Sequence, residues 1–246
     1  MTLPGSRDPT PGGDTARVTD LPSSLMALIP AFQEGPRIGA VATAARRHLP
    51  VVVIDDGSQE DTAAAAERAG ATVLRQVPNA GKGVALRVGF RHALAAGAEA
   101  VVTLDADGQH DPDEIPTFVR AFRASRPGLI VGRRDFSAMP PTRRLANTVG
   151  GWAVSAAVGR HVPDNQSGYR LVGRTLMGAL LDSDETGFEF EVEMIARCIA
   201  LGLPLSWVPI RTIYAGEPSH IRPLRHLREF ARVTRKARRI VRGDRV

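Results

Sequence analysis

Short apolar runs alternate with longer amphipathic segments through the first half of the chain. The apolar runs predict buried strands, and they fall at residues 25–32, 51–54, 71–76, 100–104 and 129–132. The segments between them have the apolar spacing of helices, and they fall at residues 36–48, 61–69, 83–96 and 113–125. Either Asp111 or Asp113 is suited to cap the last of these helices.

Strands that alternate with helices, and that are apolar throughout, are typical of a parallel sheet covered on both faces. The sequence therefore predicts an α/β fold with a mostly parallel central sheet and helices on both faces. The second half is less regular. Its predicted elements are a helix at 145–158, a polar loop at 163–170, a helix at 189–201 and a strand at 205–213.

The chain is expected to divide into three parts. Residues 1–24 are rich in Pro and Gly and predict a flexible leader. Residues 25–220 form the globular domain, and residues 221–246 form a basic amphipathic C-terminal helix.

Composition limits the class of protein. The chain has 246 residues, 43% of them apolar, which is enough for one domain with a substantial core. Cys198 is the only cysteine, so an intramolecular disulfide is impossible and a cysteine-based zinc site is disfavoured. No apolar run reaches the roughly 18 to 20 residues that cross a bilayer, and the N-terminal residues lack the apolar segment of a secretory signal. These features favour a cytoplasmic protein.

The positive charge is concentrated at the C-terminus. The chain has 32 Lys and Arg against 26 Asp and Glu, a net charge of +6. Residues 221–246 contain ten Lys and Arg against Glu229 and Asp244, a net charge of +8, which leaves −2 for residues 1–220. The domain is therefore nearly neutral, and the basic segment favours an anionic membrane surface over nucleic acid as a partner.

The basic segment is amphipathic. On a helical wheel most cations share one arc, namely Arg225, Arg228, Arg232, Arg235, Lys236, Arg239 and Arg242. Apolar residues share the other arc, namely Leu227, Phe230, Val233, Ala237, Ile240 and Val241. Such a helix suits an anionic bilayer surface. The same pattern fits a helix that docks on the domain with a solvated basic face, and the sequence leaves both open.

The sharpest chemical signal is the segment Asp105-Ala106-Asp107-Gly108-Gln109-His110. It follows an apolar strand, where alternate residues can point two carboxylates to one side. Divalent cations bind carboxylate oxygens and also diphosphate oxygens, and Gln109 could add a neutral oxygen ligand. Its place at a strand end favours a metal and diphosphate site over an ordinary capped turn.

Two further turns follow predicted strands. Asp55-Asp56-Gly57-Ser58 could accept hydrogen bonds from a ribose or a base, or could be a plain turn. Asn79-Ala80-Gly81-Lys82-Gly83 lacks the spacing of a P-loop, which argues against a kinase or ATPase. Lys82 is one of only two lysines, so either a role for its ammonium group or a solvated turn explains it.

Together these segments resemble family 2 glycosyltransferases, and within them the dolichyl- or polyprenyl-phosphate mannosyltransferase-like group. The matching segments follow the family's order over residues 25–222. They are residues 28–34, 53–58, 81–83, 104–110, 132–134, 166–170, 188–194 and 219–220.

The resemblance implies a GT-A fold, which is Rossmann-like, with a nucleotide diphosphate sugar as donor. It assigns Mg²⁺ or Mn²⁺ to Asp105, Asp107 and Gln109. The nucleotide-sugar pocket is expected to contain Pro30, Ala31, Glu34, Asp56, Lys82, Asp105, Asp107, Gln109 and His220. The acceptor phosphate is expected to meet Arg133, Arg144, Ser167 and Arg170, and the catalytic residues to be Asp107, Arg133 and Arg170.

The implied reaction is an inverting transfer of mannose or glucose, from GDP-mannose or UDP-glucose, to a polyprenyl or dolichyl phosphate. A phosphate monoester is already an anion, so arginine donors matter more than a general base. The protein is then expected in the cytoplasm, peripherally on the cytoplasmic face of the membrane.

Two other functions remain as alternatives. The first is transfer to a sugar hydroxyl or a small soluble acceptor. The second is a basic nucleic-acid-binding protein, which is disfavoured because aromatic residues make up only 5% of the chain and residues 1–220 are slightly acidic.

Overall fold

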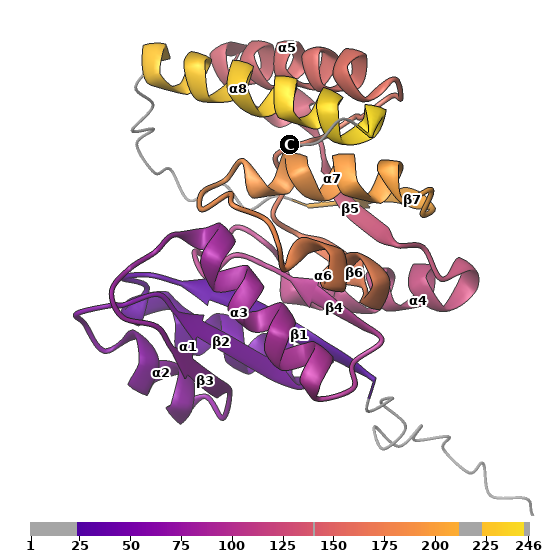
Figure 1. Ribbon diagram of the computed structural model, residues 1–246. Coiled ribbons are helices and arrows are strands. Elements are labelled where there is room, and N and C mark those ends of the chain that lie inside the picture. Colours follow the sequence, from indigo (N-terminus) through magenta and orange to yellow (C-terminus); the bar gives the residue numbers. More distant parts are fainter. Residues whose placement is uncertain (1–23, 140, 212–222, 244–246) are drawn as a thin grey trace, which may run out of the picture.

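The computed structural model describes residues 24–139, 141–211 and 223–243, which form one sheet with helices packed on both faces (Figure 1). The strands are β1 (Leu25–Ala31), β2 (Val51–Asp55), β3 (Thr72–Arg75), β4 (Ala100–Thr103), β5 (Leu129–Arg134), β6 (Arg170–Gly173) and β7 (Leu205–Ile210). The α-helices are α1 (Gly35–Arg46), α2 (Thr62–Arg68), α3 (Lys82–Ala95), α4 (Ile115–Ser125), α5 (Pro141–Val158), α6 (Arg174–Leu180), α7 (Phe190–Ala200) and α8 (Pro223–Arg242). The predicted α/β architecture is confirmed.

The sheet formed by the described residues has the strand order β3-β2-β1-β4-β6-β5-β7. β1, β2, β3 and β4 run parallel, and β5 and β7 pair in parallel with each other. β6 runs antiparallel to both of its neighbours, β4 and β5. The order reverses at β1, whose neighbours are β2 and β4, and parallel α/β sheets bind ligands beside such a reversal.

Apolar side chains on the two faces of the sheet form two cores. One core packs β-strand residues such as Ile29 and Val53 against helices α1, α2 and α4. The other packs residues such as Leu28 and Ile54 against α3, α6 and α7, with α5 and α8 outside them. This burial on both faces explains why the strands are apolar throughout.

Two elements were absent from the sequence-based expectations. β6 is only four residues long, and α6 follows it directly. The sequence predicted a polar loop ending at Arg170, whereas Arg170 begins β6. Short elements of this kind form through pairing with β4 and β5, and that pairing leaves no periodic signal in the local sequence.

A 3-10 turn, η2 (Pro112–Glu114), precedes α4, and Asp111 caps it by accepting a hydrogen bond from the backbone N–H of Asp113 at 3.0 Å. A second 3-10 turn, η3 (Phe136–Ala138), lies between β5 and α5.

The flexible leader predicted for residues 1–24 falls almost entirely outside the described residues. Within the described ranges, no helix is both long enough and apolar enough to cross a bilayer.

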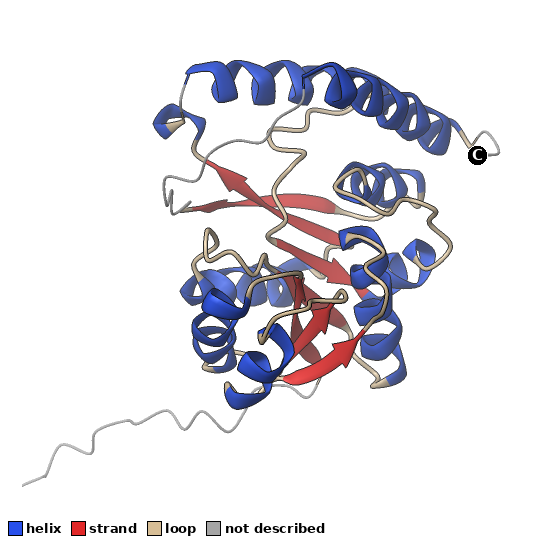
Figure 2. Cartoon of the chain, turned by 90° about the vertical axis from the view of Figure 1, so that its left-hand side faces the viewer, coloured by secondary structure: helices blue, strands red, loops and turns tan. Residues whose placement is uncertain are grey.

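Helix α8 docks on the domain, alongside α5 and above α7 (Figures 1 and 2). Val233 and Ala237 are buried in this contact. The Nζ atom of Lys236 lies 3.1 Å from a carboxylate oxygen of Glu185 and 3.0 Å from one of Glu193, and it also pairs with Asp184. The sequence placed Lys236 on the solvated basic arc, and that placement is wrong because these three acids draw it to the docked face.

The rest of the basic arc agrees with the wheel wherever the side chains are described. Arg232 binds both oxygens of Glu185, at 2.8 and 2.7 Å. Four arginines are exposed on the side of the helix opposite Val233, namely Arg235, Arg238, Arg239 and Arg242. The helix is therefore docked on the domain and also presents a solvated basic face.

We expect Lys236→Met to destabilise the fold by about 1.5–3 kcal/mol, because it removes charged hydrogen bonds to the buried carboxylates of Glu185 and Glu193, which then keep only Arg232 and Arg197 as cationic partners. Denaturant unfolding of the full chain measures the change. Arg238→Met is the matched control, since it removes an exposed cation from the same helix and is expected to cost about 0.5 kcal/mol or less. Equal effects of the two substitutions would contradict this role for Lys236.

The effect of Lys236→Met is also expected to depend on pH. The hydrogen bond from Lys236 lowers the pKa of Asp184 below 3.8. Burial raises the pKa of Glu185, but Arg232 and Lys236 outweigh it and lower that pKa below 4.5. Since both pKa values are lower in the folded chain, the ion pairs stabilise the fold at neutral pH and lose their effect on acidification. The difference between wild type and Lys236→Met should therefore be largest near pH 7 and shrink below about pH 4.

Candidate active site

A cleft of about 370 Å³ opens at the carboxyl ends of β1, β2 and β4. The sequence places polar residues directly after these strands, and the parallel pairing brings them to one edge of the sheet. The cleft is lined by Pro30, Ala31, Phe32, Glu34, Asp56, Asn79, Gly81, Lys82, Ala85, Asp105, Ala106, Asp107 and Phe188.

The residues predicted for the nucleotide-sugar pocket converge on this cleft. Those that line it are Pro30, Ala31, Glu34, Asp56, Lys82, Asp105 and Asp107. Gln109 lies next to the cleft, where its backbone N–H donates to Oδ1 of Asp107 at 2.9 Å. His220 lies outside the described residues. Segments more than seventy residues apart in the chain thus line one cleft.

Lys82 is the first residue of α3, and its ammonium group lies at the centre of the cleft wall. Its Nζ atom is 2.6 Å from Oδ1 of Asp105 and 2.8 Å from Oε1 of Glu191. Burial by itself would lower the pKa of Lys82, but the charges of Asp105 and Glu191 raise it above the usual value. Lys82 therefore stays charged at neutral pH, and the role of its ammonium group is favoured over a solvated turn.

The glycines beside Lys82 allow a close approach between two segments. A Cβ atom at Gly81 would lie 2.4 Å from the carbonyl oxygen of Thr186, and one at Gly83 would lie 2.5 Å from that of Glu185. Gly81 also has a φ of +98°, which favours glycine. The backbone N–H of Gly83 donates to the carbonyl of Thr186 at 2.8 Å. The Gly-Lys-Gly segment is thus a packing motif that holds Lys82 in place.

Asp105 is surrounded by groups that keep it ionised. Burial raises its pKa, but the charge and hydrogen bond of Lys82 outweigh this, and the pKa falls to about 2. The Nδ1 atom of His110 accepts a hydrogen bond from the backbone N–H of Asp105 at 3.1 Å, so that nitrogen carries no proton. Burial lowers the pKa of His110, which agrees with a neutral ring.

Gly168 leaves room for the Asp105 carboxylate. A Cβ atom at this position would lie 2.7 and 2.8 Å from the two oxygens of Asp105 and 2.8 Å from Nζ of Lys82. The carbonyl of Gly168 accepts a hydrogen bond from Oγ1 of Thr103 at 2.8 Å, which ties the loop to the end of β4. The segment 166–170 of the predicted acceptor site therefore lies directly against Asp105.

Asp56 lines the cleft and also holds its wall. Its Oδ1 atom accepts from Gln76 Nε2 at 2.5 Å and from the backbone N–H of Ala80 at 3.0 Å. Its Oδ2 atom accepts from the backbone N–H of Gly81 at 2.7 Å. The carboxylate therefore fixes the turn that precedes Lys82, in addition to any contact with a ligand.

Arg170 does not reach the cleft surface. Its side chain is fully buried and donates to the backbone carbonyls of Ser167, Asn165 and Glu191, at 2.7, 3.1 and 2.5 Å. Burial lowers its pKa to about 10, so the guanidinium remains charged. The expected contact between Arg170 and an acceptor phosphate does not fit this placement, because carbonyl groups already surround the guanidinium. Arg170 instead positions the loop 165–167 and the start of α7.

The other residues predicted for the acceptor are distributed around the site. Arg133 is exposed at the end of β5, and Arg144 is exposed on α5. Ser167 is buried, and its hydroxyl is without a hydrogen-bond partner among the described residues. Arg134, which the sequence did not single out, binds both carboxylate oxygens of Asp164 at 2.8 and 2.9 Å.

Two residues, one behind the cleft wall and one lining it, were not assigned a role from the sequence. Glu191 is buried and contacts Lys82 through Oε1, while its Oε2 atom has no hydrogen-bond partner among the described residues. Phe188 is exposed at the cleft, with its ring centroid 5.1 Å from Nζ of Lys82. The segment 188–194 was part of the family resemblance, but helix spacing groups Glu189 with Glu193 and does not single out Glu191.

The donor atoms at the cleft suit a hard divalent cation. Asp105 and Asp107 both line it, and Gln109, whose backbone N–H binds Asp107 in the same turn, carries a neutral amide oxygen of the kind that such ions bind. Burial raises the pKa of Asp107, and the neighbouring charge of Asp105 adds to that effect, which is the repulsion expected between two adjacent carboxylates. Because residue 168 is a glycine, no side chain at that position covers the carboxylate oxygens of Asp105. The residues thus fit Mg²⁺ or Mn²⁺.

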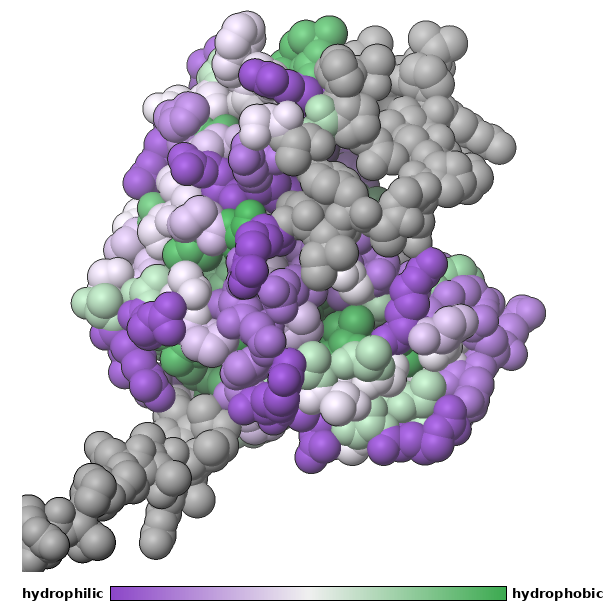
Figure 3. Space-filling view, turned by 180° about the vertical axis from the view of Figure 1, so that it is seen from behind, coloured by the Kyte–Doolittle hydropathy of each residue, from purple (hydrophilic) through white to green (hydrophobic). Residues whose placement is uncertain are grey.

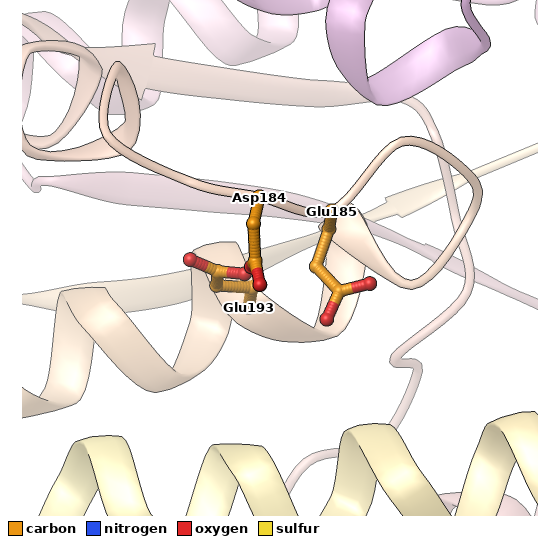
Figure 4. Close-up of side chains that lie close together, drawn as sticks. All are labelled: Asp184, Glu185 and Glu193. Carbon is orange, nitrogen blue, oxygen red and sulfur yellow. The ribbon is translucent and has the colours of Figure 1, made fainter. Parts of the chain in front are cut away.

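A second acidic group lies elsewhere. Among the described residues, Asp184, Glu185 and Glu193 bring carboxylate oxygens within 4.8 Å of one another (Figure 4). The ammonium group of Lys236 contacts all three, so this group stabilises α8 and is not a metal site.

Comparison with known proteins gives the family. The family model described as Glycosyl transferase family 2 matches residues 26–177, which is more than half of the chain. The chain belongs to glycosyl transferase family 2. The predicted resemblance is therefore confirmed, and the match covers the cleft residues from β1 to the loop before β6.

Curated relatives include transferases that use polyprenyl phosphates. The chain is 30% identical over 230 residues to the polyprenol monophosphomannose synthase of Mycolicibacterium smegmatis, which covers 85% of this chain and 84% of that protein. It is 29% identical over 201 residues to the undecaprenyl-phosphate mannosyltransferase of Micrococcus luteus, covering 76% and 82%. The chain is a family 2 glycosyltransferase with relatives among polyprenyl-phosphate sugar transferases.

Solved structures show the same fold. Glucosyl-3-phosphoglycerate synthase from Mycobacterium tuberculosis, in complex with phosphoglyceric acid, superposes with a TM-score of 0.68 at 21% identity, covering 91% of this chain and 81% of that one. The same enzyme with Mn²⁺, uridine diphosphate and phosphoglyceric acid gives a TM-score of 0.67, covering 89% and 78%. The GT-A fold is thereby confirmed.

We expect Gly168→Ala to weaken nucleotide binding by roughly tenfold or more, which corresponds to about 1.4 kcal/mol. The new methyl group would push against both Asp105 oxygens and Lys82, and so distort the cleft floor. Isothermal titration with GDP and UDP in the presence of Mn²⁺ measures the loss.

Gly178→Ala is the matched control. Gly178 lies within α6, and a Cβ atom there would meet nothing within 4 Å. Alanine in a helix is more stable than glycine by about 0.5–1 kcal/mol, so this variant should bind nucleotide normally and unfold at a slightly higher temperature. Normal binding by Gly168→Ala would show that the close approach to Asp105 has no role in the site.

Proposed function

We propose that this protein transfers a mannose or glucose residue from a nucleotide diphosphate sugar, GDP-mannose or UDP-glucose, to a polyprenyl or dolichyl phosphate, with inversion at the anomeric carbon. The observation that carries the proposal is the convergence of Glu34, Asp56, Lys82, Asp105 and Asp107 on one cleft. The M. smegmatis and M. luteus relatives, named for a polyprenol and for undecaprenyl phosphate, support the lipid acceptor.

In the proposed complex, Asp105, Asp107 and Gln109 hold Mg²⁺ or Mn²⁺. When bound, such an ion neutralises negative charge on a departing diphosphate. Two structures of the M. tuberculosis enzyme, which is bound there to uridine diphosphate with Mn²⁺ or Mg²⁺, support this assignment. The cleft walls at Pro30, Ala31, Glu34 and Asp56 then enclose the nucleoside, and His220 is proposed to reach the diphosphate.

Lys82 supplies a fixed positive charge beside the diphosphate. Its ammonium group is held by Asp105 and Glu191 before any ligand arrives, so little reorganisation accompanies binding.

The acceptor needs orientation more than activation. The oxygen of a phosphate monoester is already anionic near neutral pH and can attack the anomeric carbon in line without losing a proton. Arg133 and Arg144 are exposed and are proposed to bind the acceptor phosphate. Ser167 presents a hydroxyl without a partner among the described residues, and it can donate a hydrogen bond to the same group.

A small soluble acceptor is the second candidate. It is favoured by one finding, namely that two structures of the M. tuberculosis enzyme are complexes with phosphoglyceric acid, which is also a phosphate ester. Acceptor assays with a short-chain polyprenyl phosphate and with 3-phosphoglycerate distinguish the two.

We propose a cytoplasmic location, with peripheral contact between α8 and the anionic cytoplasmic face of the membrane.

The donor prediction is tested by thermal unfolding with GDP, UDP and their sugars, each with and without Mn²⁺. At a ligand concentration of about 100 times Kd, a bound nucleotide should stabilise the fold by about 2.7 kcal/mol and raise Tm by roughly 5–10 °C. Asp107→Asn should remove the part of the shift that depends on Mn²⁺. Asp182→Asn, which changes an exposed acid outside the cleft, should leave the shift intact. If no nucleotide gives a metal-dependent shift, the proposed donor is wrong.

The acceptor prediction is tested with Arg133→Ala. Loss of a charged hydrogen bond of about 1.5–3 kcal/mol should raise the acceptor KM by roughly tenfold or more, while the nucleotide-induced Tm shift is unchanged. Arg123→Ala removes an exposed arginine from α4 and should change neither quantity. Arg170→Ala should reduce both acceptor use and stability, because its carbonyl contacts hold the loop against Asp105. Equal loss of nucleotide and acceptor binding in Arg133→Ala would contradict this division.

A further inference from the structure

The segment between α6 and α7 contains a buried acid, Glu185, that contacts two helices with two different groups. Its backbone carbonyl binds α3, and its carboxylate binds α8. Hydrophilic side chains occupy much of the outer surface of the molecule (Figure 3), whereas only 3% of Glu185 is exposed. An acid is rarely buried unless its partners require it, so the contacts of Glu185 indicate its role.

The backbone of this segment holds the start of α3. The carbonyl of Glu185 accepts a hydrogen bond from Nη1 of Arg87 at 2.5 Å. The carbonyl of Thr186 accepts one from the backbone N–H of Gly83 at 2.8 Å. A Cβ atom at Gly83 would lie 2.5 Å from the carbonyl oxygen of Glu185, so the two segments are in close contact. Lys82 directly precedes Gly83, and its position therefore depends on where this segment lies.

The carboxylate of Glu185 is held by α8. Arg232 donates to both of its oxygens at 2.8 and 2.7 Å, and Nζ of Lys236 lies 3.1 Å from one of them. The side chains of Asp184 and Glu185 point toward α8, which is drawn in yellow (Figure 4). A bidentate arginine fixes the orientation of a carboxylate as well as its position. The segment is therefore anchored to α8 on one side and packed against α3 on the other.

A second connection leads from α8 to the same lysine through α7. Nζ of Lys236 lies 3.0 Å from a carboxylate oxygen of Glu193. Glu191, two residues earlier on α7, lies 2.8 Å from Nζ of Lys82. Both connections begin at the cations of α8 and end at Lys82, so the docked helix can influence the cleft through intermediate residues.

We propose that Glu185 is a positioning residue for the nucleotide cleft, and that the docking of α8 through Arg232 and Lys236 controls how tightly the cleft binds a nucleotide diphosphate. The inference rests on the proposed function for the identity of this ligand. A charge that is already in place binds with little reorganisation. Releasing Glu185 loosens the backbone around Lys82 and lowers affinity, although no group that lines the cleft is removed.

The alternative is that these ion pairs only stabilise the docked helix. Variants would then lower Tm and bind nucleotide normally whenever they are folded. Positioning instead predicts a change within the folded protein, in the affinity of the cleft and in the hydrogen bonds at the start of α3.

The test uses the full chain and Glu185→Gln, which keeps the size of the side chain and removes its charge. Isothermal titration with GDP and UDP in the presence of Mn²⁺ measures nucleotide affinity at a temperature where the variant is folded by circular dichroism. We expect Kd to rise by roughly three- to tenfold. Asp182→Asn is the matched control, because it neutralises an exposed acid of the same segment and should leave Kd unchanged.

Arg232→Met should give a similar loss of affinity, although Arg232 does not line the cleft. Arg232→Lys keeps the charge and should recover most of the loss. Arg238→Met removes an exposed arginine from the same helix and should have no effect on Kd. Phe122→Leu controls for stability, because it lowers Tm through the core on the other face of the sheet and should bind nucleotide normally.

Hydrogen exchange reports the start of α3 without any ligand. The peptide that contains Gly83, analysed by mass spectrometry, should exchange roughly three- to tenfold faster in Glu185→Gln and Arg232→Met than in the wild type. The same peptide should be unchanged in Arg238→Met and Phe122→Leu.

Wild-type nucleotide affinity in both Glu185→Gln and Arg232→Met would overturn the proposal, whatever their Tm. If the wild type binds neither GDP nor UDP, hydrogen exchange decides. Faster exchange at Gly83 in the two variants would then support the link from α8 to Lys82 and count against the proposed function alone. Unchanged exchange would overturn the link as well.

Discussion

The buried ammonium group of Lys82 is the interaction on which the candidate site depends. It contacts Asp105, which follows β4, and Glu191, which begins α7, at 2.6 and 2.8 Å. The two carboxylates come from parts of the chain that are distant in sequence, and the ammonium group of Lys82 bridges them. A buried carboxylate without its cation is costly, so removing Lys82 would weaken the contact between the turn at Asp105 and the start of α7.

Much of the fold follows from local sequence. The apolar strands and the helices between them are regular from β1 to β5, because each strand is buried on both faces and each helix has one buried side. Parallel pairing then brings the residues after β1, β2 and β4 to one edge, so Pro30, Asp56 and Asp105 could be predicted to share a site. β6 escaped prediction because its four residues become a strand only between β4 and β5.

Contacts with residues distant in sequence explain why the sequence patterns misplaced two cations, Arg170 and Lys236. Arg170 resembles a ligand of the acceptor phosphate in its motif, yet the carbonyls of Asn165 and Glu191 fold around it. Lys236 resembles a solvated cation on a helical wheel, yet acids near residue 185 draw it inward. In each case the residue type correctly indicated a cation that binds oxygen atoms. Only the tertiary structure shows that those atoms belong to the protein itself.

The segment from Asp184 to Glu193 connects the cleft at Lys82 with the docked helix α8. Glu191 and Glu193 are two residues apart on α7, so they point to nearly opposite sides, one toward Lys82 and the other toward Lys236. Between them and Asp184, the carbonyl of Thr186 packs against the turn that carries Lys82. A rotation of α7 that released Lys236 would therefore also move Glu191 away from Lys82. Helix α8 is thus linked to the cleft through α7, whose Glu193 pairs with Lys236 and whose Glu191 pairs with Lys82.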